Sequence, residues 1–134
     1  MDISSLVTAK EATQKGRDFA FGDAVLVIAA SGNTEHRKVL RRLYEPHAKM
    51  LAFGGSLDAE VGVNVDDAAM AEAVLVGWKG LKKDGKEFPY NRENALWLLQ
   101  NVAMLRNFVV KASEDSALFT IAAVEAAKDV LKKS

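Results

Sequence analysis

A mostly apolar stretch in the middle of the chain predicts a buried helix. Glu72 is the only charged residue between Ala68 and Val76, so a helix there would be apolar on nearly every side. Gly77 and Gly80 follow this stretch, and glycine suits the left-handed residue that often ends a helix. We therefore expect the helix to run up to these glycines and to end there.

The polar segment that follows predicts a tight turn and then a second helix. Asp84 and Gly85 can adopt the positive φ angles of a type I′ turn, so the residues on either side should form a short polar hairpin or an extended loop. Pro89 favours an extended residue before it, while Asn91 and Glu93 have the pattern of a helix cap and an acidic first turn. An amphipathic helix beginning RENALWLLQN is therefore expected.

Two β-prone runs near the N-terminus predict a hairpin. Residues 17–21 and 24–30 are separated by a Gly-Asp pair, which suits a type II′ turn. The second run, AVLVIAA, does not alternate strictly between apolar and polar residues. We expect this strand either to be covered on both faces or to extend into the sheet of a partner, with Val27 and Ile28 as candidate self-association residues.

Helical spacing dominates the rest of the chain. One long helix is expected from Glu35 to Ala52, with a kink or a restart at Pro46, because proline lacks a backbone N–H. Ser56 is a candidate cap for the next helix, although the acidic pair at 66–67 could equally begin a fresh one.

The last third of the chain predicts two further helical segments, and together these patterns define a fold class. Apolar residues recur at helical intervals from Ala95 to Val109 with a break at Asn101, and a C-terminal helix is expected after Glu114. The sequence therefore predicts a mainly α fold, a single domain of about five helices with a small N-terminal β-hairpin. Within residues 1–134 we expect a loose N-terminal arm (1–16), the hairpin (17–30) and a helical body (34–134).

Composition excludes several functional classes. With 18 basic and 18 acidic residues the chain has no formal net charge, so the overall attraction expected of a nucleic-acid-binding protein is missing. There is no cysteine, which excludes disulfides and thiolate metal sites and is compatible with a reducing cytoplasm. The chain has neither a basic segment leading into an apolar run at its start nor about 18 consecutive apolar residues, so neither export nor membrane insertion is expected.

One cluster of positive charge stands out and is interpreted as a solvated helix face. It lies on the first long helix, where Glu35 and Glu45 can pair with part of it. No aromatic residue is interleaved with it, so it is not expected to bind nucleic acid. Its members are Arg37, Lys38, Arg41 and Arg42, with Lys49 further along.

Candidate catalytic residues are few. His36 and His47 are eleven residues apart, which separates their Cα atoms by roughly 16 Å along a helix, too far for one metal ion. The acidic pairs at 66–67 and 114–115 could hold Mg²⁺, but adjacent helix residues diverge, so capping and solvation are favoured. No glycine cluster has the spacing of a phosphate-binding loop. We expect no enzyme activity, no cofactor and no catalytic metal, with a small enzyme using the acidic pairs as the open alternative.

The segment from Val76 to Ala95 resembles a family. It is similar to the tail assembly chaperones of long-tailed (siphovirus-type) bacteriophages, which often carry a V-G-W-x-G-L segment, an Asp-Gly turn, a Pro-Tyr pair and a helix opening E-N-A. The likeness extends to MDISSLVT at the N-terminus, to the EPH sequence at 45–47 and to LRNFVVKAS from Leu105. The matching central residues are Val76, Gly77, Trp78, Gly80, Leu81, Asp84, Gly85, Pro89, Tyr90, Glu93, Asn94 and Ala95.

This resemblance implies a function without catalysis. Such a chaperone would bind the tape measure protein in the cytoplasm of the bacterial host and keep it soluble until the tail tube assembles around it, so it would be absent from the mature virion. It would also have a longer, frameshifted form as a partner, and the paired lysine codons of Lys132 and Lys133 are the candidate frameshift position. The alternative is an adaptor or scaffold domain in a bacterial or phage multiprotein complex.

A chaperone of a helical client needs adaptable apolar side chains on its surface. The candidates for client binding are Trp97, Met104 and Phe108 on one predicted helix and Phe119 on the next, because they widen the apolar stripe beyond what a core requires. The zero net charge and the apolar helices also predict a homo-oligomer.

Overall fold

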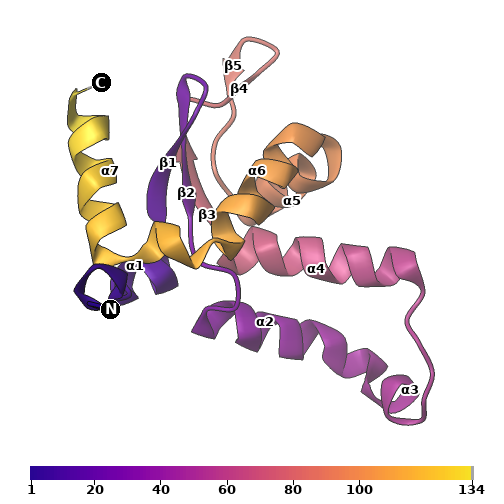
Figure 1. The fold of residues 1–134 in the computed structure, drawn as a ribbon. Coiled ribbons are helices and arrows are strands. Elements are labelled where there is room, and N and C mark those ends of the chain that lie inside the picture. Colours follow the sequence, from indigo (N-terminus) through magenta and orange to yellow (C-terminus); the bar gives the residue numbers. More distant parts are fainter. Residues whose placement is uncertain (134) are drawn as a thin grey trace.

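The structure is a computed structural model, and it describes the backbone of residues 1–133 and the side chains of residues 1–130. Helices make up most of this part, but they combine with two small antiparallel sheets, so the fold is mixed α/β (Figure 1). In chain order the elements are η1 (Ser4–Leu6), α1 (Lys10–Lys15), β1 (Arg17–Phe21), β2 (Ala24–Ile28), α2 (Thr34–Tyr44), η2 (Glu45–His47), α3 (Ala48–Ala52), α4 (Ala59–Ala73), β3 (Leu75–Lys79), β4 (Lys82–Lys83), β5 (Lys86–Glu87), α5 (Arg92–Asn101), α6 (Ala103–Glu114), η3 (Ser116–Phe119) and α7 (Ile121–Lys133).

The N-terminal hairpin is present, but it belongs to a larger sheet than the sequence predicted. The strand order is β1-β2-β3, and all neighbours are antiparallel. Strand β3 was expected to be the end of a helix; instead α4 ends at Ala73 and the following residues pair with β2. A short apolar run is compatible with a buried strand as well as with a buried helix, so its periodicity could not distinguish the two structures. Gly77 therefore lies within a strand and does not end a helix.

The core lies between one face of this sheet and the helices that follow it. Phe19, Leu26 and Trp78 are cross-strand neighbours on that face, and all three are buried. They share a single apolar cluster with residues from α5, α6 and η3, which include Leu98, Leu99, Leu105, Val109 and Phe119. In Figure 1, α7 lies along β1, whereas α5 and α6 lie on the other side of the sheet.

Local turn and cap chemistry was predicted well. Asp84 and Gly85 have φ angles of 54° and 77°, which confirms the tight turn between β4 and β5. The side chain of Asn91 accepts a hydrogen bond from the backbone N–H of Asn94 at 2.7 Å, so it caps α5 as expected. The break at Asn101 and the restart at Pro46 are also confirmed, since α5 ends at the former and the short helix η2 contains the latter.

Three other expectations need correction. Residues 1–16 are not a loose arm, because a β-bridge joins Thr8 to Thr120 and Ala12 of α1 is buried. The acidic pair at 66–67 begins no helix, because it lies inside α4, which Asp58 caps. The helical body expected at residues 34–134 also contains strand β3, which was not expected there.

Helices α2, α3 and α4 form an arm that extends away from the sheet (Figure 1). Its base packs through Val39 of α2 against Ala69 and Ala73 of α4. Asn33 closes this base: its amide nitrogen donates to the carbonyls of Ala30 at 2.8 Å and Ala73 at 2.9 Å, while its side-chain oxygen caps α2. Asn33 therefore ties the arm to the residues that follow β2.

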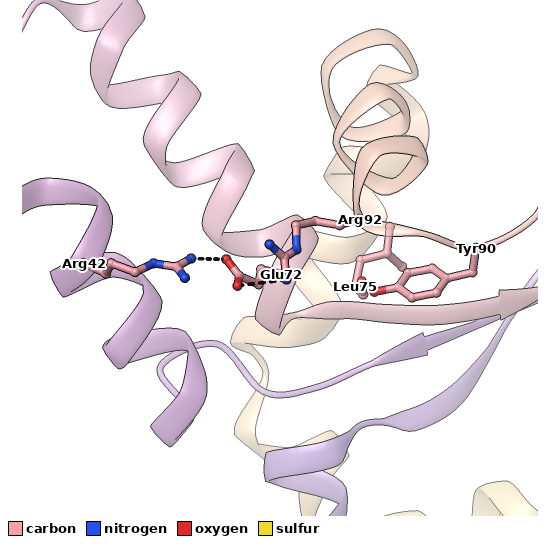
Figure 2. A network of polar contacts seen from close by, with 5 residues as sticks. All are labelled: Arg42, Glu72, Leu75, Tyr90 and Arg92. Carbon is pink, nitrogen blue, oxygen red and sulfur yellow. Dashed lines mark hydrogen bonds and ion pairs between the residues drawn. The ribbon is translucent and has the colours of Figure 1, made fainter.

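Two sets of ion pairs join α4 to its neighbours. Figure 2 shows Glu72 between Arg42 of α2 and Arg92 of α5. The Nη2 atoms of these arginines lie 2.5 and 3.2 Å from the two carboxylate oxygens of Glu72. Deeper in the structure, Asp67 is only 2% exposed. Its Oδ1 accepts a hydrogen bond from Nε of Arg106 at 3.0 Å and forms an ion pair with Nη2 of the same residue at 2.9 Å. No helix in the part of the chain that the structure describes is long and apolar enough to span a membrane.

The Asp67–Arg106 pair provides a test of the fold. We expect Arg106→Met to lower the free energy of unfolding by about 2–4 kcal/mol, because it leaves the buried carboxylate without its partner. The matched control is Arg42→Met, which removes an exposed arginine from a carboxylate that keeps Arg92, and it should cost about 1 kcal/mol or less. Urea unfolding monitored by circular dichroism measures both, and equal losses would contradict the assignment.

Candidate client-binding surface

The four residues expected to bind a client do not form one surface. Phe119 is 2% exposed and packs against Phe19 at 6.1 Å between ring centroids, so it belongs to the core. Phe108 is half-buried between Phe19 and Phe21, at 6.3 and 5.2 Å. Their apolar character therefore serves the sheet–helix interface, and only the two other candidates remain available to a partner.

Those two candidates, Trp97 and Met104, are exposed but lie on different helices. Trp97 of α5 is 38% exposed, and Met104 in the first turn of α6 is 78% exposed. The sequence suggested one continuous apolar face, but the break after Asn101 separates α5 from α6. The role of these two residues in client binding stays a prediction.

The strand expected to mediate self-association is the central strand of the sheet. Because β2 pairs with β1 on one side and β3 on the other, neither of its edges can join a partner's sheet. Ile28 is fully buried, and Val27 packs against Gly77 of β3. Association through the edge of β2 is therefore excluded in this fold, whereas the expectation of a homo-oligomer stays a prediction.

A different apolar surface lies at the end of the arm. No residue from Glu45 to Asp66 is buried, although this segment contains many large apolar side chains. Phe53, which follows α3, is 88% exposed. The other exposed members are Met50, Leu51 and Val63, and the half-buried ones are Leu57, Val61 and Val65. We call these seven residues the arm tip.

Sequence analysis missed the arm tip because helical spacing identifies an apolar stripe but does not show whether the stripe faces the core or the solvent. Leu57, Val61 and Val65 recur every four residues, which is typical of a core-facing helix. In the structure they lie near the start of α4, beyond the buried positions that begin at Asp67. The sequence did contain one signal for this exposed surface. Pro46 on one side and Gly54 and Gly55 on the other limit α3 to a short helix, which is too small to cover the apolar residues of the arm tip.

The outer face of α2 carries most of the positive charge of the arm. Arg37, Lys38 and Arg41 are exposed and form no ion pair within the described residues. The sequence suggested that Glu35 and Glu45 pair with part of this patch, but Arg42 instead pairs with Glu72 of α4. The expected ion pairs are therefore wrong, although the patch is a solvated face as predicted.

A polar cleft of about 250 Å³ lies where α2, α4 and α6 meet. His36 opens onto it and is itself nearly buried; its Nδ1 accepts a hydrogen bond from the backbone N–H of Gly32 at 2.9 Å. Asp66, Arg106 and Glu114 also line the cleft. Among the described residues, no three histidine or carboxylate side chains converge as metal ligands would. The geometry fits a structural role for His36, and the expectation of no catalysis stays a prediction.

A larger open groove of about 880 Å³ runs between α7 on one side and α1 and β1 on the other. Its lining mixes apolar residues such as Ile121 and Val124 with charged ones such as Lys15 and Asp129. None of the described side chains of α7 is buried, so this helix lies on the surface of the fold. The side chains of Lys132 and Lys133, the candidate frameshift position, are outside the described residues.

Comparison with known proteins identified a matching family. A family model described as "YdaY prophage protein" matches residues 31–133, which include the arm, β3 and the helices that follow. The matched region begins after the β1–β2 hairpin. No curated protein and no solved structure matches the chain.

Because His36 is buried beside this cleft, we expect the free energy of unfolding to depend on pH. Burial lowers the pKa of His36, and the charge of Asp66 only partly offsets this. Because the folded chain then binds protons less readily than the unfolded chain, the contribution of His36 to stability is complete above about pH 6.5 and is lost as the pH falls below it. Urea unfolding at about pH 7.5 and about pH 5.5 should show a lower free energy of unfolding at the acidic pH.

The control for this prediction is His36→Asn, whose side-chain oxygen can still accept the bond from Gly32 but does not titrate. This variant should lose less stability on acidification than the wild type. His47→Asn, which removes the partly exposed histidine of η2, should keep the wild-type difference. If His36→Asn retains the whole difference, His36 is not its source.

Proposed function

The chain belongs to the YdaY prophage protein family, and from this we propose that it acts in phage assembly as a tail assembly chaperone that binds the tape measure protein and keeps it soluble. The family match supports a phage protein, and the likeness of the segment from Val76 to Ala95 to tail assembly chaperones supports the specific role. The observation that carries the proposal is the arm tip, a large apolar surface held away from the core.

The arm tip has the properties that a reversible holder of helices requires. A long helical client presents stripes of apolar side chains that would otherwise aggregate, and these bind to exposed apolar surfaces on a partner. Methionine has an adaptable side chain and phenylalanine a large one, so exposed Met50 and Phe53 suit apolar stripes of different sequence. Contacts of this kind involve no covalent step, so the client can be released when tail tube subunits compete for it.

The position of the arm tip also suits this role. Arg106 and Asp67 hold α4 to α6, and Asn33 holds its base, so the distal part of the arm can contact a client without opening the core. If several copies assemble on one tape measure protein, weak contacts from each arm add up through their effective concentration. The predicted homo-oligomer would therefore strengthen binding without any new contact.

An adaptor or scaffold domain is the competing interpretation, because an apolar arm could equally hold another phage protein. Gene order distinguishes the two proposals. A reading frame for a very long, coiled-coil-rich protein immediately downstream supports the chaperone, and its absence supports the adaptor.

The arm tip gives a direct test of the proposed function. We expect the double variant Leu51→Glu/Phe53→Glu to lose co-purification with a co-expressed tape measure protein, because two charges interrupt the apolar surface. The fold should survive, since both side chains are already exposed. The matched control is Ser56→Glu, which adds charge to an exposed polar position of the same arm.

Two further variants separate the arm tip from the residues expected on sequence grounds. Trp97→Glu and Met104→Glu should weaken client binding less than the arm variant does. Circular dichroism must show that every variant is folded. If the folded arm variant still holds the tape measure protein and the folded Trp97→Glu variant does not, the client binds near α5 and not on the arm.

A further inference from the structure

The β4–β5 hairpin places a lysine over an exposed tryptophan. The Nζ of Lys83 lies 4.3 Å from the ring centroid of Trp97 and 5.9 Å from that of Phe88. Trp97 keeps 38% of its surface exposed, and no carboxylate pairs with Lys83 in the part of the chain that the structure describes. The ammonium group is therefore held by aromatic rings alone.

A second lysine lies beside the first. In the register of the hairpin, Lys83 is directly opposite Lys86, so both side chains point to the same face, the one that covers Trp97. Like charges directly opposite each other destabilise a strand pair, and neither lysine has an ion-pair partner among the described residues. A negatively charged group from outside the chain would relieve this repulsion.

The aromatic residues beneath the lysines are rigidly held. Phe88 contacts Trp97 edge-on at 5.8 Å and stacks on Trp78 at 5.9 Å with an interplanar angle of 12°. The indole N–H of Trp78 donates to the carbonyl of Phe88 at 2.6 Å, which fixes this strand end to the sheet. Trp97 is therefore supported from below and presents a preorganised apolar surface.

From this arrangement we propose that Lys83, Lys86 and Trp97 form a docking site for an acidic amphipathic helix of a partner protein. A carboxylate of the helix binds the two ammonium groups, and an apolar side chain beside it packs on Trp97. A charge-assisted hydrogen bond is stronger than an exposed cation–π contact, so the carboxylate can draw Lys83 away from the ring and uncover it. The inference does not depend on which phage protein is the client of the arm.

The surroundings favour a protein partner over single-stranded nucleic acid. Stacking of bases requires aromatic faces along a continuously positive groove, but an exposed carboxylate lies beside this site. Glu93, one helical turn before Trp97 on α5, is exposed and would repel a phosphate placed beside the ring. Isolated carboxylates on a helix can avoid this group.

Tryptophan fluorescence tests the site on the complete chain. The probe is a synthetic helical peptide with leucines on one face and flanking glutamates, and the wild type is compared with Trp97→Phe, which keeps only the buried Trp78. We expect saturable binding that shifts the emission of the wild type but not of Trp97→Phe. The double variant Lys83→Glu/Lys86→Glu should bind at least about tenfold more weakly, the loss expected for one charge-assisted bond.

Three comparisons make the experiment decisive. Lys38→Glu/Arg41→Glu imposes the same charge change on the outer face of α2 and should leave peptide binding unchanged. A peptide with every glutamate replaced by lysine should not bind. A short oligothymidylate should not shift the Trp97 emission.

The proposal is overturned if the lysine variants of the hairpin bind like the wild type, if the α2 variant alone weakens binding, or if the oligothymidylate binds and the acidic peptide does not. Lys83→Gln/Lys86→Gln guards against unfolding caused by charge reversal, because it removes the same charges with little change in shape. Unimpaired peptide binding by this neutral variant also overturns the proposal.

Discussion

The buried side chain of Asn33 is the contact on which the arrangement of this protein depends. It uses both amide hydrogens and its oxygen, and so joins the residues after β2, the start of α2 and the end of α4. Without this side chain, the carbonyl of Ala73 and the backbone N–H of His36 would lose this partner at a chain reversal. A single polar residue thereby links the base of the arm to the end of the sheet, and Val39 packs against Ala69 and Ala73 within the arm.

Sequence analysis succeeded where structure is decided by neighbours in the chain and failed where it is decided by distant ones. The Asp84-Gly85 turn, the Asn91 cap and the break at Pro46 depend on the conformational preferences of a few residues, and all three are present. Strand β3 depends on pairing with β2, which lies far away in the sequence, and its apolar residues would suit a helix equally well. The mixed α/β fold could not be predicted for this reason.

The same distinction explains the candidate site. By sequence Phe108, Phe119 and Trp97 are equivalent large residues on predicted helices, but the sheet buries the first two around Phe19 and leaves the third at the surface. Conversely, the residues of the arm tip have the spacing of a core and remain uncovered, because the helix opposite them is interrupted. Whether an apolar residue is exposed depends on the residues that pack against it in the fold. The spacing of apolar residues in the sequence does not show this.

The topology of the arm has a consequence for how such proteins diversify. Strands β2 and β3 are neighbours, so α2, α3 and α4 together form one long connection between them, and the hydrogen bond from the N–H of Ala29 to the carbonyl of Val74 at 2.8 Å closes this connection at its base. Insertion or deletion of helical turns near α3 would therefore change the reach of the arm without moving the register of the sheet. The sheet and its helices can remain constant in evolution while the distal arm is remodelled for a different partner.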